Sequence, residues 1–199
     1  MTAITPLRDF VTRFTQLVEQ EPPLDRALNE GSILLRKLVA RDGWLPEAFA
    51  RPNPERYSQY LLHADPLERF SVVSFVWAPG QTTPLHDHRV WGLIGVLRGR
   101  EREQQFERDP DGHFKETGET FLEEGEVATL APGRNDYHRV SNALSNKASV
   151  SIHVYGANIG AVSRATYDIE TGAEKTFISG YSSDVVPNLW DRSLERSAA

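Results

Sequence analysis

Residues 80–99 read GQTTPLHDHRVWGLIGVLRG and contain the pattern that decides the fold. His86 and His88 stand two residues apart, and the stretch after them is mostly apolar up to Gly99. Alternate residues of a β-strand share one face, so both imidazoles can point into the same cavity and bind one ion. An isolated pair of this kind also occurs at the polar end of an ordinary strand. The residues around the pair therefore decide between a metal site and a strand end.

The chain on either side of this stretch has the pattern of short strands separated by turns. Residues 70–77, FSVVSFVW, are rich in β-branched and aromatic residues and are closed by Pro79-Gly80. We expect further strands, with turn signals between them, at 90–97, 102–108, 127–131, 136–141, 148–155 and 162–169. Many short strands with regular turns predict a sandwich or barrel rather than an alternating α/β fold.

The first fifty residues follow a helical period instead. Apolar residues recur every three or four positions between Thr5-Pro6 and Pro22-Pro23, and again from Ile33 to Val39. We therefore expect a mainly β fold with N-terminal α-helices packed on a barrel. A chain of 199 residues suits one domain. Its expected parts are helices at 1–50, a β-barrel at 51–190 and a polar tail at 191–199, with loose attachment from Asn188 onward.

Charge and composition exclude several classes of function. The formal net charge of −6 argues against a surface for nucleic acids or anionic membranes, because both select basic patches. The absence of cysteine excludes disulfides, thiolate ligands and a cysteine nucleophile. No stretch approaches the roughly 20 apolar residues that span a bilayer, and no signal-peptide core opens the chain. We expect a cytoplasmic protein that handles small molecules; the sequence does not set its oligomeric state.

A later segment supplies a third histidine, His138. With Gly125, Pro132-Gly133 and Asn142 it resembles the second motif of the cupin superfamily, and residues 80–99 resemble the first. The proline lies one residue further from the histidine than usual, and Gly92 stands where cupins commonly have a glutamate. Cupins are double-stranded β-helix barrels that carry a metal inside. The resemblance implies that fold, with the three histidines at 86, 88 and 138 as metal ligands.

The missing glutamate matters for the chemistry of the metal. Three neutral imidazoles leave the full divalent charge on the ion, and such a site favours an anionic ligand such as a thiolate or carboxylate. A set of two histidines and one carboxylate is typical of non-haem Fe(II) oxygenases. Three histidines with open positions also suit Zn²⁺ in a hydrolytic role. Spacing alone leaves the metal identity open.

Residues 149–155, SVSIHVY, alternate strictly between polar and apolar side chains. Ser151, His153 and Tyr155 therefore share one face of a strand, at about 6–7 Å intervals along the chain. If that face lines the barrel, the hydroxyl, imidazole and phenol form a relay that can orient the tyrosine hydroxyl and pass a proton. A polar edge facing solvent would show the same alternation.

In sequence order, the HDH motif, His138 and the Ser-x-His-x-Tyr strand resemble the thiol dioxygenase family, whose best-known member is cysteine dioxygenase. The similarity extends from about Arg56 to Trp190. It implies an Fe(II) centre at the three histidines and a catalytic Ser–His–Tyr triad beside it. It also implies a substrate thiol and O₂ as reactants and a sulfinic acid as product.

Two departures separate the subfamilies. Animal cysteine dioxygenases crosslink a cysteine to the triad tyrosine, but Gly92 stands at that place and the chain has no cysteine. They also hold the substrate carboxylate with an arginine where this chain has Gln59. Bacterial 3-mercaptopropionate dioxygenases share this glycine and this glutamine, and carry an arginine that Arg164 matches. The resemblance thus implies 3-mercaptopropionate as substrate, contacted by Arg164, Gln59 and Tyr155, with cysteine as a second candidate.

Three alternatives stay open at this point: a related oxygenase that prefers cysteine, a non-catalytic cupin that binds a small carboxylic acid or metal, and a Zn²⁺-dependent hydrolase or isomerase. Among other residues, His63 and His113 are predicted to lie on the surface or in turns. Trp77 and Trp91 are expected in the core. Asp87 should point away from the ion.

Overall fold

The computed structural model describes residues 3–134 and 136–190, and the predicted tail at 191–199 lies outside these described residues. Two α-helices come first, α1 (Thr5–Val18) and α2 (Leu24–Val39), followed by a short 3₁₀ helix (Glu47–Phe49). The strands of the barrel follow: β1 (Ser58–Ala64), β2 (Ser71–Trp77), β3 (Leu85–His86), β4 (Gly92–Arg98), β5 (Arg100–Arg108), β6 (Phe114–Glu123), β7 (Val127–Leu130), β8 (His138–Asn142), β9 (Ser149–Tyr155), β10 (Arg164–Tyr167) and β11 (Glu174–Phe177). A second 3₁₀ turn, Ile159–Ala161, separates β9 from β10.

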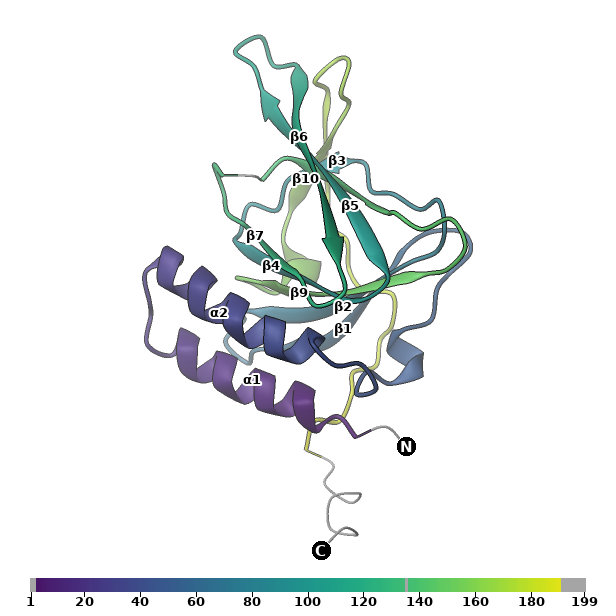
Figure 1. The fold of residues 1–199 in the computed structure, drawn as a ribbon. Coiled ribbons are helices and arrows are strands. Elements are labelled where there is room, and N and C mark those ends of the chain that lie inside the picture. The colour runs from purple at the N-terminus through teal and green to yellow at the C-terminus, as the bar shows by residue number, and fades with distance from the viewer. Residues whose placement is uncertain (1–2, 135, 191–199) are drawn as a thin grey trace, which may run out of the picture.

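The strands form two antiparallel sheets that enclose the barrel interior (Figure 1). One sheet has the order β1-β2-β9-β4-β7 and the other β11-β10-β3-β8-β5-β6, so the chain passes repeatedly from one sheet to the other. Side chains from both sheets meet between them, among them Phe75 and Trp77 of β2 and Val140 of β8. This is a mainly β cupin double-stranded β-helix with two N-terminal helices, and the predicted fold class is confirmed.

Strands β2 and β9 are buried along their whole length because both of their faces are covered. Val72, Val76 and Ile152 belong to the core shared with the helices, whereas Phe75 points into the barrel. The helices lie against the outer face of this sheet (Figure 1). The strict alternation at 149–155 therefore separates a helix-facing row from a barrel-facing row.

Helix α2 reaches the sheet closely at Gly95 of β4. A Cβ atom there would lie 3.0 Å from Leu35 Cγ and 3.1 Å from Val39 Cγ1, so glycine makes room for the two helical side chains. The helix also begins earlier than the apolar period from Ile33 suggested, and its first turns bury Ala27 and Leu28 among polar residues. Within the described residues, neither helix is long and apolar enough to cross a membrane.

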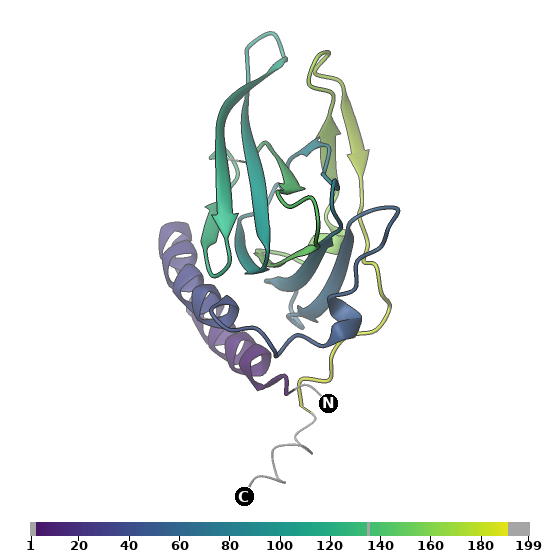
Figure 2. The same ribbon diagram turned by 45° about the vertical axis from the view of Figure 1, so that its right-hand side comes forward.

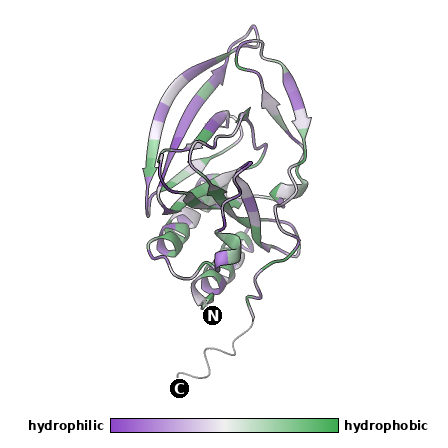
Figure 3. Cartoon of the chain, turned by 90° about the vertical axis from the view of Figure 1, so that its right-hand side faces the viewer, coloured by the Kyte–Doolittle hydropathy of each residue, from purple (hydrophilic) through white to green (hydrophobic). Residues whose placement is uncertain are grey.

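The long β5–β6 hairpin and the β10–β11 hairpin extend beyond the rest of the barrel (Figure 2). Strands β6 and β11 were not among the segments expected from the sequence. Their side chains are mostly exposed, and much of the long hairpin is hydrophilic (Figure 3). Pairing with β5 and β10 holds β6 and β11 in the sheet. Their sequences have no apolar alternation from which a strand could be predicted.

The chain after β11 returns alongside β1 toward the helices (Figure 2). The backbone of Ser182 donates to the carbonyl of Gln59 at 2.8 Å. The expectation of loose attachment from Asn188 is wrong for Leu189, which is buried and accepts a hydrogen bond from Arg8 Nη1 at 3.3 Å. The Leu189 side chain and its backbone carbonyl therefore hold the end of the described chain, although the composition there is mostly polar.

We predict that Leu35→Ala lowers the free energy of unfolding by about 2–5 kcal/mol, because it leaves a cavity between α2 and β4. Leu35 is fully buried, whereas Ile33 on the same helix is 51% exposed. Ile33→Ala is the matched control and should change stability by less than about 1 kcal/mol. Urea denaturation of both variants measures the difference, and similar losses would contradict the proposed packing of α2.

Candidate metal centre

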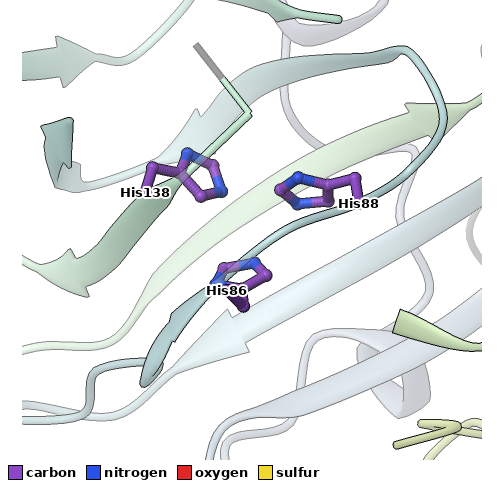
Figure 4. A group of neighbouring side chains, drawn as sticks. All are labelled: His86, His88 and His138. Carbon is purple, nitrogen blue, oxygen red and sulfur yellow. The ribbon is translucent and has the colours of Figure 1, made fainter. Parts of the chain in front are cut away.

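The pairing of β3 with β8 brings the three histidines together. His86 lies directly opposite His138 in the antiparallel register, and His88 follows β3 two residues later. The rings face a common point (Figure 4), with centroids 4.7 Å apart for His86–His88 and His88–His138 and 4.8 Å apart for His86–His138. One ring nitrogen of each lies within 4.8 Å of the others, and all three residues are buried. The result is a buried three-histidine metal site.

Each of these rings has an acceptor at Nδ1 on the side away from the common point. The acceptors are the Pro84 carbonyl for His86 at 3.1 Å, Asp136 Oδ1 for His88 at 3.2 Å and Glu103 Oε1 for His138 at 2.6 Å. An acceptor at Nδ1 fixes the tautomer and the ring orientation and leaves Nε2 for the metal. Neither Glu103 nor Asp136 was singled out from the sequence, although the alternation of REREQQFER at 100–108 offered a signal for inward-facing acids.

Burial keeps the imidazoles of His86 and His88 neutral. Burial holds the pKa of His86 and of His88 well below the usual range, and the neighbouring His138 and Arg164 lower both further. A neutral imidazole is the form that binds a metal ion. Three nitrogen donors of this kind fit a first-row transition ion such as Fe²⁺ or Zn²⁺, and the donor set alone does not choose between them.

Asp87, between the two histidines of the motif, points toward β10. Its Oδ1 accepts a hydrogen bond from the backbone of Ala165 at 2.9 Å, and its Oδ2 accepts one from the Tyr167 hydroxyl at 2.9 Å. The prediction that it faces away from the ion is confirmed. Its role is to tie the histidine segment to the neighbouring strand.

The polar row of β9 faces the barrel interior. Ser151 Oγ lies 2.8 Å from His153 Nε2, and His153 Nδ1 lies 2.8 Å from the Tyr155 hydroxyl. All three residues are buried, which excludes the alternative of a polar edge facing solvent. The Tyr155 ring also stacks on the His88 ring at 5.5 Å between centroids. The hydrogen-bonded row thus ends beside the metal site.

The interior environment fixes the protonation of this row. Burial, with a smaller effect from the neighbouring His138, lowers the pKa of His153 to about 3. Burial also raises the pKa of Tyr155 above that of a free phenol. His153 is therefore a neutral imidazole and Tyr155 a neutral phenol near neutral pH.

Gly92 pairs with Tyr155 across β4 and β9. A Cβ atom at Gly92 would lie 3.1 Å from Tyr155 Cδ1 and 3.1 Å from Leu130 Cδ1, which is tighter than ordinary packing. Glycine at this position therefore lets the tyrosine ring lie against β4. Where animal cysteine dioxygenases have the crosslinked cysteine, this chain has a glycine that lets the Tyr155 ring lie close to β4.

The metal site opens into a cavity of about 190 Å³. The three histidines, His153 and Tyr155 form one side of it. Other lining residues include Gln59, Trp77, Arg164, Phe177 and Ser179. Trp77 is buried in the core as expected, and it also lines this cavity.

Arg164 presents a cation to this cavity. The side chain is 4% exposed, its Nη2 donates to Ser179 Oγ at 2.7 Å, and its guanidinium carbon lies 4.8 Å from the centre of the Phe177 ring. Burial lowers the pKa of Arg164, but a guanidinium keeps its charge in proteins. Its Nε has no hydrogen-bond partner among the described residues. A buried donor in this state favours a ligand that accepts from it.

Gln59 lies on β1 at the wall of the same cavity. Its Nε2 donates to the Gly180 carbonyl at 2.5 Å, so the amide holds the segment that follows β11. The wall at this position is neutral. Phe177, at the end of β11, and Ser179, in the segment after it, hold Arg164, and no sequence motif marks them.

His63, His113 and Trp91 do not line the metal cavity. His63 is half-buried on β1, 5.5 Å from the ring of Phe70, so its predicted place on the surface or in a turn is wrong. Its apolar neighbours, rather than its own polarity, decide its burial. His113 is exposed in the turn before β6, as expected. Trp91 is partly buried against the core under the helices.

The family model of cysteine dioxygenase type I matches residues 38–166, from the end of α2 to β10. The chain belongs to the cysteine dioxygenase type I family. Membership agrees with the buried three-histidine site and with the triad row beside it. A family of thiol-oxidising enzymes therefore includes this chain.

Solved structures with a similar fold come from several microorganisms. A conserved protein with a double-stranded β-helix domain from Klebsiella pneumoniae is 20% identical, covers 57% of this chain and 89% of its own, and has a TM-score of 0.46. A cupin family protein from Methanocaldococcus jannaschii is 12% identical, with 55% and 87% covered and a TM-score of 0.41. A cupin superfamily protein from Desulfitobacterium hafniense is 14% identical, with 62% and 88% covered and a TM-score of 0.41.

We predict that Glu103→Gln weakens metal binding about 10- to 100-fold, because the acceptor that orients His138 loses its charge. Glu107→Gln, an exposed position on the same strand, is the matched control and should leave the affinity unchanged. Competition with a chromogenic chelator, using Zn²⁺ as the probe ion, measures both affinities. Equal affinity of the two variants would show that Glu103 does not support the metal site.

Proposed function

We propose that this member of the cysteine dioxygenase type I family is an Fe(II)-dependent dioxygenase that oxidises the thiol of 3-mercaptopropionate to the sulfinic acid. The supporting observation is one small cavity that has three neutral imidazoles on one side and the buried guanidinium of Arg164 on another. A ligand that satisfies both carries a thiolate and a carboxylate. Both atoms of O₂ end on the sulfur, so R–SH and O₂ give R–SO₂H with no further reductant.

His86, His88 and His138 would hold the iron. Bound Fe²⁺ supplies the site for thiolate and O₂ and the redox chemistry between them. Because the three ligands are neutral, they leave a positive charge at the site, and such a charge lowers the pKa of a thiol. The chain therefore favours the substrate in its thiolate form.

Arg164 would bind the substrate carboxylate. Ser179 Oγ and the Phe177 ring fix the guanidinium, and the unpartnered Nε remains as a donor. A planar guanidinium with its fixed charge matches a carboxylate in geometry and in sign. The wall at Gln59 is neutral, and it adds no charged group for an α-amino substituent. This pattern supports a substrate with a thiol and a carboxylate but no required amine.

Tyr155 would act on the substrate as a neutral hydrogen-bond donor. Its hydroxyl lies at the end of the row formed with His153 and Ser151, and its ring packs against a metal-binding histidine. From there it can donate to the carboxylate or to dioxygen at the metal site. His153 and Ser151 would fix the orientation of that hydroxyl.

Arg164→Ala should raise KM for 3-mercaptopropionate about 10- to 100-fold, because hydrogen bonds to charged groups contribute roughly 1.5–3 kcal/mol. Cysteamine has no carboxylate, and its KM should change little. Arg56→Ala is the control, because Arg56 is exposed and does not line the cavity. Steady-state O₂ consumption measures both substrates. Equal losses for the acid and the amine would contradict a carboxylate site at Arg164.

Gln59→Arg should shift the ratio of kcat/KM toward cysteine, because the new guanidinium offers the carboxylate a binding site on β1, where the resemblance places the carboxylate-binding arginine of cysteine dioxygenases. We expect a change of about tenfold, the size of one charge-assisted contact. Gln59→Met, which is neutral and of similar length, is the control for lost hydrogen bonding to Gly180. If both variants shifted the ratio alike, the charge at this wall would not be the cause.

The reaction itself is tested with ¹⁸O₂ and protein of known metal content. We expect the sulfinic acid to carry two labelled oxygens and the rate to follow the iron content. A rate that followed zinc content, with no labelled product, would favour a hydrolytic cupin instead. Ligand binding without any turnover would favour a non-catalytic cupin that binds a small carboxylic acid.

A further inference from the structure

A buried carboxyl group lies at the far end of the triad row. Glu101, on β5, is 1% exposed, and none of the three metal-binding histidines is among its hydrogen-bond partners. Glu103 on the same face of the strand supports His138, but that role does not extend to Glu101. The proposed reaction therefore leaves this acid unused.

The surroundings of Glu101 connect it to the relay of Ser151, His153 and Tyr155. Its Oε1 accepts a hydrogen bond from Ser149 Oγ at 3.4 Å, and its Oε2 has no partner at hydrogen-bond distance among the described residues. The Ser151 hydroxyl and the Trp77 indole also act on the carboxyl and lower its pKa, so they favour its charged form. Ser151 is thus the last hydroxyl of the relay and a neighbour of the acid.

Few charges act on this carboxyl. Its cross-strand partners are Leu122 on β6 and Asn142 on β8, and the groups that face it from β9 and β2 are the serine hydroxyls and the indole. Glu103 on its own strand is the charged neighbour that acts on it. Burial raises the pKa of Glu101 to about 8, with a smaller rise from the charge of Glu103. The acid is therefore mainly neutral near neutral pH and ionises above it.

A hydrogen bond between Ser151 and the unpartnered carboxyl oxygen of Glu101 would complete the relay in two arrangements, and these differ by one proton. With Glu101 ionised, the Tyr155 hydroxyl donates to His153 Nδ1, Nε2–H donates to Ser151, and the serine hydroxyl donates to the carboxylate. With Glu101 protonated, its O–H donates to Ser151, the serine donates to Nε2, and Nδ1–H donates to the tyrosine oxygen. In that second arrangement the Tyr155 proton is free for an acceptor in the cavity.

We propose that Glu101 is the terminal positioning residue of the relay, and that its protonation sets the direction in which the relay's hydrogen bonds point. The neutral acid turns the Tyr155 O–H toward the cavity, and the carboxylate turns it toward His153. A buried hydrogen-bond chain responds as a unit, because each member can donate only one hydrogen. The benefit for thiol oxidation rests on the proposed function, whereas the hydrogen-bond direction does not.

The tautomer of His153 reports this direction and is measured by ¹⁵N NMR on the full chain loaded with Zn²⁺ as a diamagnetic ion. His153 stays neutral because its pKa is about 3, so a change of its ¹⁵N shifts reports the tautomer and not ionisation. We expect Nδ1–H below the pKa of Glu101 and Nε2–H above it. Glu101→Gln should keep Nδ1–H at every pH, because the amide donates and does not ionise.

Ser149→Ala gives an independent variant. It removes a hydrogen-bond donor to the carboxylate, so the tautomer change should remain but move to higher pH. A His153 tautomer that is constant with pH in the unaltered protein would overturn the proposal. An unchanged midpoint in Glu101→Gln would overturn it as well, because another group would then be titrating.

The pH profile of turnover adds a test of the catalytic consequence. In iron-loaded enzyme, the fall of kcat on the alkaline side should move to higher pH in Glu101→Gln, because the Tyr155 proton stays directed into the cavity. If His153 switches but no thiol is oxidised, the relay inference stands and the proposed function fails. If thiol is oxidised and the alkaline fall is the same in both proteins, Glu101 does not direct the relay during catalysis.

Discussion

The pairing of His86 with His138 across β3 and β8 is the constraint on which the rest of the site depends. It fixes two imidazoles at one register position, and the two-residue step to His88 adds the third. Burial keeps the rings neutral, and acceptors at each Nδ1 orient them. The polar acceptors sit outside the ring of histidines, so the barrel supplies a desolvated nitrogen site without an adjacent carboxylate ligand.

The other polar groups of the barrel interior are arranged around this metal site. A site with a retained positive charge selects anions, and Arg164 adds a second cation at the cavity wall. The triad row leads from the site to Ser151, and the buried carboxyl beyond it, Glu101, has few charged neighbours. Helices α1 and α2 cover the outer face of the sheet, so β9 can place polar side chains inward while its outward side chains are also buried.

Much of this site could be predicted from the sequence, because strand periodicity determines which side chains share a face. The HDH motif and the row Ser151, His153 and Tyr155 are inferences of that kind, and the structure shows both pointing inward. Asp136 and Ser179 could not be found in this way, since they lie outside the strands and the path of the chain brings them to the site. Alternation places Glu103 inward, but only the pairing of β5 with β8 brings it to His138. Strand β6 was missed for a related reason: pairing with β5, not apolar alternation, holds it in the sheet.

The most direct test of the account is sulfinate formation by protein of known iron content with 3-mercaptopropionate, cysteine and cysteamine as separate substrates. The three-histidine site and the buried guanidinium of Arg164 at the same cavity predict that 3-mercaptopropionate has the highest kcat/KM, with sulfinic acid formed in proportion to bound iron. Cysteamine as the best substrate would contradict the carboxylate site. Absence of sulfinate from all three thiols with the iron site filled would contradict the proposed reaction.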